Sequence, residues 1–88
     1  MIVRIDKSFA KDIRKISDTK LLNHVADLIE TLQNCQTIKE IKDLKKLKSF
    51  PDYYRIRLGS YRIGLQRKRN EIILIRILQR KDIYTYFP

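Results

Sequence analysis

The strongest constraint on the fold is a two-residue turn, Gly59-Ser60, between two segments that alternate apolar and basic residues. Glycine at the first turn position supplies the positive φ that a type II′ hairpin turn needs. The predicted pairs, from the turn outward, are Leu58 with Tyr61, Arg57 with Arg62, Ile56 with Ile63, and Arg55 with Gly64. This register puts apolar residues on one face and arginines on the other, so the sequence predicts an antiparallel hairpin over 53–66.

A third strand is expected over residues 71–78, after a turn around residues 67–71. A two-residue loop there would bring Arg76 among the core isoleucines, so we expect a loop of three or five residues, with Ile63 opposite Ile75. Arg76 then faces Arg62, which predicts a row of three guanidiniums, Arg57, Arg62 and Arg76, on the face away from the helices. Like charges facing each other cost about 0.2–1 kcal/mol per pair. The row therefore indicates either an anion-binding surface or long side chains that splay into water.

The first half of the chain favours a strand and two helices. Residues 2–6 are short and rich in branched residues, which suits an opening strand. Ser8 is the expected N-cap of a first helix that stops near Ser17, and either Ser17 or Asp18 can cap a second helix that ends near Asn34. The second helix carries a continuous apolar stripe of Leu21, Leu22, Val25, Leu28, Ile29 and Leu32. Thr37 and Glu40 resemble a capping box that could start one more helical turn.

Together these elements predict an α+β fold in one domain, residues 1–88. An N-terminal strand and an antiparallel α-helical hairpin would accompany a small, mainly antiparallel β-sheet, with the hairpin packed on one of its faces. A domain of 88 residues buries roughly 60–65% of its unfolded surface, so its own stability is modest.

The charge distribution points to a polyanionic partner. The formal net charge is +10, and residues 1–44 carry eight Lys and Arg against seven Asp and Glu, while residues 45–88 carry twelve against three. An excess of this size favours binding to nucleic acid or to an acidic protein, since it otherwise opposes the compact state. The alternative is a basic surface that has no dedicated partner.

Several classes of site are absent from the sequence. There is no signal-peptide core and no apolar run close to a membrane span, so the expected location is intracellular. The single cysteine, Cys35, has no partner for a disulfide or a thiolate metal site, and no Gly-rich phosphate loop is present. The only histidine, His24, lies between Leu21 and Leu28 and is expected to flank the packing face. We therefore expect no metal and no cofactor.

What remains for chemistry is an arginine-rich face with nearby tyrosines. Arginine binds phosphate oxygens with a planar fork and can stabilise a pentacoordinate phosphate. Tyr84 has an ordinary pKa near 10, but guanidiniums around it, Arg80 among them, would favour its phenolate. It could then remove a proton from a ribose 2′-hydroxyl or, alternatively, stack on a base. Gly64, opposite Arg55, is expected to leave room for an RNA backbone to approach the sheet.

These residues resemble the RelE branch of the RelE/ParE toxin superfamily of toxin-antitoxin systems, over essentially the whole chain. The motifs that carry the resemblance are Leu-Lys-Lys-Leu-Lys at 44–48, Phe-Pro-Asp-Tyr-Tyr-Arg-Ile-Arg at 50–57, Tyr-Arg-Ile at 61–63 and Arg-Lys-Asp-Ile-Tyr at 80–84. The resemblance implies a metal-independent endoribonuclease that cuts messenger RNA at the ribosome through attack by the 2′-hydroxyl.

The resemblance also implies roles for individual residues. Arg62 and Arg80 would stabilise the phosphate in the transition state, Tyr84 would orient or deprotonate the nucleophile, and Arg55 and Arg57 stand where relatives often carry lysines. We add a set of expected RNA-binding residues: Lys45, Lys46, Lys48, Arg76, Lys81 and Tyr86. One departure is Gln79, since many relatives have a histidine immediately before the C-terminal arginine.

Two other functions stay open from the sequence. One is a ParE-like inhibitor of DNA gyrase, although that branch generally lacks the pair formed by Arg80 and Tyr84. The other is a relative that binds RNA, or only an antitoxin, without catalysis. The expected partners are an acidic antitoxin protein, messenger RNA and the ribosome, with a cytoplasmic free toxin that is monomeric and no association with a membrane.

Overall fold

The computed structural model describes residues 1–88 as a five-stranded sheet in the order β1-β5-β4-β3-β2. The strands are β1 (Ile2–Ile5), β2 (Leu44–Lys46), β3 (Tyr53–Leu58), β4 (Tyr61–Lys68) and β5 (Glu71–Gln79). β1 runs parallel to β5, and every other neighbouring pair is antiparallel. The sheet is therefore mainly antiparallel, as the sequence predicts.

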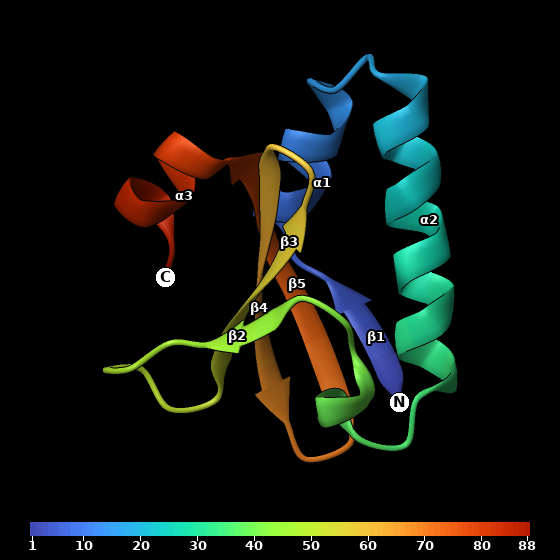
Figure 1. The fold of residues 1–88 in the computed structure, drawn as a ribbon, viewed down its shortest axis with the longest axis vertical. Helices are drawn as coiled ribbons and strands as arrows, with labels where there is room; N and C mark the ends of the chain where they lie inside the picture. The colour runs from blue at the N-terminus through green and yellow to red at the C-terminus, as the bar shows by residue number, and fades with distance from the viewer.

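Helices lie on both sides of this sheet (Figure 1). α1 (Lys7–Arg14) and α2 (Thr19–Asn34) form the expected hairpin on one side, and α3 (Arg80–Tyr86) lies on the other. A short 3₁₀ turn, η1 (Ile38–Glu40), begins at the predicted capping box, where the Glu40 carboxylate accepts a hydrogen bond of 2.8 Å from the Thr37 amide. The α+β fold class is confirmed. No helix is both long enough and apolar enough to span a bilayer.

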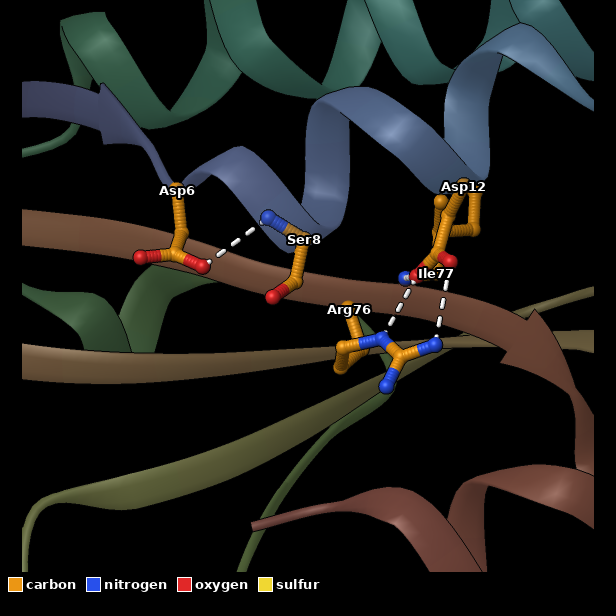
Figure 2. A network of polar contacts seen from close by, with 5 residues as sticks. All are labelled: Asp6, Ser8, Asp12, Arg76 and Ile77. Carbon is orange, nitrogen blue, oxygen red and sulfur yellow. Dashed lines mark hydrogen bonds and ion pairs between the residues drawn. The ribbon is translucent and has the colours of Figure 1, made fainter.

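The helix caps agree with the sequence at α2 and differ at α1. Asp18 caps α2, and its carboxylate accepts a hydrogen bond of 3.2 Å from the Leu21 amide. The cap of α1 is Asp6, not Ser8, and the Asp6 carboxylate accepts a 3.0 Å hydrogen bond from the Ser8 amide (Figure 2). Asp is as good an N-cap as Ser, and it stands directly after β1, so the helix begins there and leaves Ser8 inside its first turn.

The main core lies between α1, α2 and the sheet. Its fully enclosed members include Phe9, Leu32, Ile56, Ile63, Leu65, Ile72, Leu74 and Ile77. Cys35 is also buried there, and its thiol lies 3.2 Å from the Leu32 carbonyl as a hydrogen-bond donor. Truncation of such a buried Leu or Ile to Ala costs about 2–5 kcal/mol, so this core holds the sheet that carries the opposite, basic face.

The hairpin of β3 and β4 has the predicted register in every pair from Leu58 with Tyr61 to Arg55 with Gly64. Gly59 has φ = 63°, as the two-residue turn requires. Arg57 and Arg62 therefore face each other on the side of the sheet away from α1 and α2.

The predicted register of β4 with β5 is wrong. The connecting turn has only two residues, Arg69 and Asn70, and the ladder contains a bulge between Gly64 and Leu65. Leu65 pairs with Leu74 and Gly64 with Arg76, so Ile75 is the extra, unpaired residue. The bulge moves Arg76 off the core face without an odd loop, because one inserted residue reverses the alternation of side chains.

Two elements are additions to the predicted architecture. β2 extends the sheet beyond β3, in the stretch of alternating leucine and lysine residues from 44 to 48. α3 packs on the basic face through Ile83 and is followed by Phe87, and both side chains are buried. β2 thus forms the edge of the face that carries the arginines, and α3 covers part of that face.

Candidate functional site

A cavity of about 360 Å³ lies on the basic face where β2, β3, β4 and α3 meet. Its lining consists of Asp43, Leu44, Lys45, Arg55, Arg57, Arg62, Arg80 and Tyr84. The structure thus brings together all five residues predicted to be catalytic, along with Lys45 from the predicted RNA-binding set. We call this cavity the arginine pocket.

The β-hairpin positions three of the guanidiniums. Arg55 and Arg57 are two residues apart on β3, so both side chains point to the same face of the sheet. Arg62 of β4 is directly opposite Arg57, and Lys45 of β2 is directly opposite Arg55. Two pairs of like charges therefore face each other, each at a cost of about 0.2–1 kcal/mol. This arrangement favours an anion between them.

Hydrogen bonds hold two of these arginines in place. One terminal nitrogen of Arg62 donates to the carbonyls of Gly59 and Tyr61, at 2.8 and 2.9 Å, which fixes the side chain beside the hairpin turn. The Arg57 guanidinium donates to the Asp43 carboxylate at 3.1 Å, and the Arg57 amide donates to the Asp43 carbonyl at 3.2 Å. Each guanidinium still has further N–H groups that can bind a phosphate oxygen.

α3 brings the remaining two side chains to the pocket. Arg80 and Tyr84 are four residues apart, so they lie on one side of the helix. The Arg80 amide donates a 2.9 Å hydrogen bond to the Ser60 carbonyl, which ties the start of α3 to the hairpin turn near Arg62. Ile83, three residues after Arg80, is buried and fixes the helix against the sheet. Arg62 and Arg80 are thus held at the same end of the arginine pocket.

The space above Gly64 is closed, contrary to the expectation that an RNA backbone could approach there. The ring of Phe87 occupies it, and a Cβ on Gly64 would lie 2.6 Å from three of the ring carbons. The missing side chain at residue 64 therefore admits the protein's own C-terminal segment, and it allows α3 to lie close to the sheet.

Tyr84 is the exposed phenol of the pocket, with 60% of its surface accessible. The Arg55 guanidinium carbon lies 4.6 Å from the centroid of its ring. Hydrogen bonding and charge from Arg55, and secondly from Arg80, lower the pKa of Tyr84 below its ordinary value because they favour the phenolate. This direction matches the sequence-based prediction, with Arg55 rather than Arg80 as the main cause.

Arg76 lies outside the arginine pocket, so the predicted row of three guanidiniums is wrong. Leu78, not Arg76, is opposite Arg62. The Arg76 guanidinium forms a bidentate ion pair with the buried Asp12 of α1, at 2.8 and 3.0 Å, as Figure 2 shows. The same carboxylate accepts a 3.0 Å hydrogen bond from the Ile77 amide. Hydrogen bonding to Asp12 raises the pKa of Arg76, and the ion pair joins α1 to β5.

The other predicted RNA-binding residues divide between two further hollows. Lys81 and Tyr86 lie with Arg76 in a cavity of about 490 Å³ that does not contain Arg80 or Tyr84. Lys46 and Lys48 line a hollow of about 280 Å³ that also includes Lys45. The first of these is larger than the arginine pocket, but it is lined by two carboxylates, Asp12 and Asp82, so its volume alone is a poor guide to phosphate binding.

Sequence reasoning missed Asp43, the one carboxylate in the arginine pocket. It has a positive φ of 63°, a conformation that Asp and Asn adopt more readily than most residues. An Asp directly before the alternating segment 44–48 was the available signal for a turn that leads into a strand. No three His, Cys, Asp or Glu side chains are grouped so that they could hold a metal ion.

Comparisons with a family model and with a curated relative point to the same family of proteins. Residues 3–84 match the family model described as ParE toxin of type II toxin-antitoxin system, parDE. The chain is 40% identical to Toxin RelE3 of Methanocaldococcus jannaschii over the full length of both proteins.

Solved structures agree with this match. The crystal structure of the RelB-RelE antitoxin-toxin complex from Methanococcus jannaschii superposes with a TM-score of 0.83 at 38% identity, covering 97% of this chain and 99% of that one. The intact E. coli RelBE toxin-antitoxin complex gives a TM-score of 0.66 at 26% identity, with 89% and 94% covered.

Proposed function

The chain belongs to the ParE toxin family of type II toxin-antitoxin systems, and from this premise we propose that it is a toxin of the RelE type that cleaves messenger RNA at the ribosome. The observation that carries the proposal is the arginine pocket. Four guanidiniums, one ammonium group and one phenol with a lowered pKa surround a cavity large enough for a phosphodiester.

In the proposed reaction, the ribose 2′-oxygen attacks the adjacent phosphorus, and the bond from phosphorus to the 5′-oxygen breaks. Tyr84 as phenolate accepts the proton of the 2′-hydroxyl, because its lowered pKa raises the phenolate fraction near neutral pH. The leaving 5′-oxygen takes a proton from water. The products are a 2′,3′-cyclic phosphate and a 5′-hydroxyl end.

The arginines supply the electrostatic part of the mechanism. Arg62 and Arg80, held at the hairpin turn, would bind the non-bridging oxygens as negative charge builds up on the pentacoordinate phosphate. Arg55 lowers the pKa of Tyr84, and Arg57 and Lys45 would bind the flanking backbone. Gln79 stands where many relatives have a histidine, so no imidazole is available there, and the proposed reaction uses Tyr84 as the base and water as the acid.

We also propose an acidic antitoxin as the partner that neutralises this toxin in the cytoplasm. The net charge of +10 favours an acidic protein, and the two solved relatives described above are complexes of a toxin with its antitoxin. Self-repulsion between copies of so basic a chain favours a monomer when the toxin is free.

The description of the matching family model supports a second candidate, inhibition of DNA gyrase by a ParE-type toxin. The phenol that Arg55 and Arg80 activate has no use in an inhibitor that acts by binding alone. The full-length match to a protein named Toxin RelE3 also favours the ribonuclease.

The test is cleavage of messenger RNA on purified ribosomes by wild type, Tyr84→Phe and Arg62→Ala, with Arg14→Ala as a control. Arg14 is an exposed arginine of α1 outside the arginine pocket. We expect cleavage by wild type and by Arg14→Ala, with 2′,3′-cyclic phosphate ends, and large losses in the two pocket variants. Absence of cleavage together with inhibition of DNA supercoiling would assign the protein to the second function.

A further inference from the structure

We propose that Phe50 is a base-stacking platform for single-stranded RNA, in a second nucleotide subsite next to the arginine pocket. The subsite is the hollow of about 280 Å³ named above, whose lining includes Lys45, Lys46, Lys48, Phe50 and Phe87. The proposal rests on the proposed function, because the strand that enters this subsite is the one whose phosphate lies in the arginine pocket.

Phe50 is unusual in being a large apolar side chain that remains 47% exposed among lysines. It lies in the loop between β2 and β3, and its ring contacts Tyr53 edge-on, with centroids 6.4 Å apart and planes at 70°. Tyr53 in turn contacts Phe87 at 5.7 Å. An edge-on contact covers less of a ring than a stacked one, so Phe50 retains surface that a base can cover.

The loop that presents Phe50 is held at both of its ends. The Leu47 amide donates to the Tyr53 carbonyl at 2.9 Å, and the Tyr53 amide donates to the Phe50 carbonyl at 3.2 Å. The Arg67 amide of β4 donates to the Asp52 carbonyl at 2.8 Å. A ring held in this way loses little conformational entropy when a ligand stacks on it, which favours binding.

The subsite is continuous with the arginine pocket. Lys45, Arg55 and Tyr84 line both hollows, so a strand whose phosphate lies beside Tyr84 can place the neighbouring nucleotide near Phe50. The side chains that line the subsite include no carboxylate and four basic groups. An aromatic ring beside a positively charged groove is the arrangement that binds single-stranded nucleic acid, with bases on the ring and phosphates on the basic residues.

The same chemistry argues for RNA over a protein partner at this ring. A protein interface typically needs an apolar centre with few charges. Here the exposed rings of Phe50 and Tyr84 lie among four basic side chains: Lys45, Lys46, Lys48 and Arg55. A nucleotide suits both the aromatic ring and the basic side chains, because it carries a flat base and a negatively charged phosphate.

A tryptophan introduced at residue 50 gives a direct readout, since the chain has no native tryptophan. The probe is a single-stranded oligoadenylate of about six nucleotides, the length that such grooves bind, with 2′-O-methyl riboses so that it is not cleaved. Phe50→Trp should lose fluorescence on addition of the probe as adenine stacks on the indole. The control is Ile5→Trp on β1, at the opposite edge of the sheet, where the native side chain is 52% exposed.

A second probe separates stacking from charge. An abasic strand with the same number of phosphates should bind through the lysines without quenching the indole of Phe50→Trp. For the native ring, Phe50→Ala should weaken oligoadenylate binding about tenfold and the abasic strand hardly at all. Equal quenching by both strands, no quenching by either, or an unchanged affinity in Phe50→Ala would overturn the proposal. The proposal also fails if Phe50→Ala weakens only the complex with the antitoxin.

Cleavage of messenger RNA on ribosomes can distinguish a failure of this inference from a failure of the proposed function. If both hold, Phe50→Ala should raise KM for messenger RNA about tenfold and leave kcat nearly unchanged, because the ring binds but does not touch the reacting atoms. Cleavage that is insensitive to Phe50→Ala would reject the subsite and leave the ribonuclease intact. Quenching of the indole in Phe50→Trp without any cleavage by wild type would reject the ribonuclease and leave an RNA-binding subsite.

Discussion

Gly64 of β4 lies directly beneath the ring of Phe87, so that a Cβ on residue 64 would stand 2.6 Å from three ring carbons. Real Cβ atoms essentially never approach other heavy atoms to that distance. The contact joins the centre of the sheet to the residue that follows α3, and α3 carries Arg80 and Tyr84. The position of the two helix-borne pocket residues therefore depends on a glycine that is distant from them in sequence.

We predict that Gly64→Ala displaces α3 and lowers cleavage about a hundredfold, since a shift of about 1 Å in a reacting group can have that effect. The cost in unfolding free energy should be about 1–3 kcal/mol, as for other overpacked sites. Ribosome cleavage and urea denaturation measure the two effects. An alanine that is tolerated in both assays would show that Phe87 does not set the position of α3.

A double-mutant cycle with Phe87→Ala tests the same contact from the other side. Phe87 is 6% exposed, so its truncation alone should destabilise the fold by about 3–5 kcal/mol. With the ring absent, the added methyl at residue 64 has space, so the two substitutions should be non-additive by about 0.5–3 kcal/mol. Strict additivity would argue against a direct steric contact.

The ion pair of Asp12 with Arg76 leads to a prediction about stability. Asp12 binds both the Arg76 guanidinium and the Ile77 amide, and its side chain is 4% exposed against 25% for that of Arg76. Asp12→Ala leaves a mostly buried cation without its partner and should lower the unfolding free energy by about 2–3 kcal/mol, which allows for the partial exposure of Arg76. Urea denaturation measures the loss, and Asp27→Ala on the exposed side of α2 is the control.

Arg76 should also contribute little to RNA binding, since its charge is already neutralised by Asp12. The slope of log Kd against log salt for single-stranded RNA should fall by about one unit in Arg62→Ala and stay near the wild-type value in Arg76→Leu. A slope that falls equally in both variants would return Arg76 to the RNA-binding surface.

The hairpin of β3 and β4 could be predicted from the sequence because two independent signals agreed. The glycine of the turn set the loop length, and the alternation of isoleucine with arginine set the faces, so only one register satisfied both. The same reasoning failed for β4 and β5 because it assumed an unbroken ladder. A bulge between Gly64 and Leu65, with Ile75 as the extra residue, lets a two-residue turn coexist with an Arg76 outside the core. A glycine inside a strand often marks a bulge, so Gly64 was the available signal, but we interpreted it as room for an RNA backbone.

The side chains of the arginine pocket were predicted better than the elements that hold them in place, α3 and β2. Arg55, Arg57 and Arg62 follow from the hairpin register. Arg80 and Tyr84 were predicted from the chemistry of a phenol beside guanidiniums and from the family resemblance, without the helix that brings them to the pocket. α3 is short, and its anchors Ile83 and Phe87 are too few to produce a helical period. Asp43 was missed because its role depends on β2, whose three residues pair only through tertiary contact with β3.

Asp43 offers a way to strengthen the pocket. Its carboxylate binds Arg57, and it is the one negative charge in the lining. Asp43→Asn keeps a residue that tolerates a positive φ and removes the charge, so RNA binding should tighten severalfold and its salt slope should steepen. Fluorescence anisotropy with a labelled oligonucleotide measures both quantities. Asp27→Asn removes the same charge far from the pocket and should change little, and weaker binding in Asp43→Asn would show that Asp43 is needed to position Arg57.

The pKa of Tyr84 predicts how cleavage depends on pH. Because Arg55 and Arg80 lower this pKa, the phenolate is the minor form below it and increases about tenfold for each pH unit. The cleavage rate should therefore rise with pH until the lowered pKa is passed and then level off. Tyr84→Phe should abolish this rise, and Arg55→Ala should move the plateau to higher pH and reduce the rate near neutral pH.

The titration of Tyr84 can also be measured directly, without an assay of RNA cleavage. The chain has five tyrosines, so the phenolate absorbance of wild type minus that of Tyr84→Phe isolates the residue of interest. The midpoint of this difference should lie below the ordinary tyrosine value and move upward in Arg55→Ala, more than in Arg80→Ala, since Arg55 is the larger cause. If the cleavage profile and the difference titration have different midpoints, the group that limits the rate is not Tyr84, and the phenolate would act by orienting the 2′-hydroxyl instead.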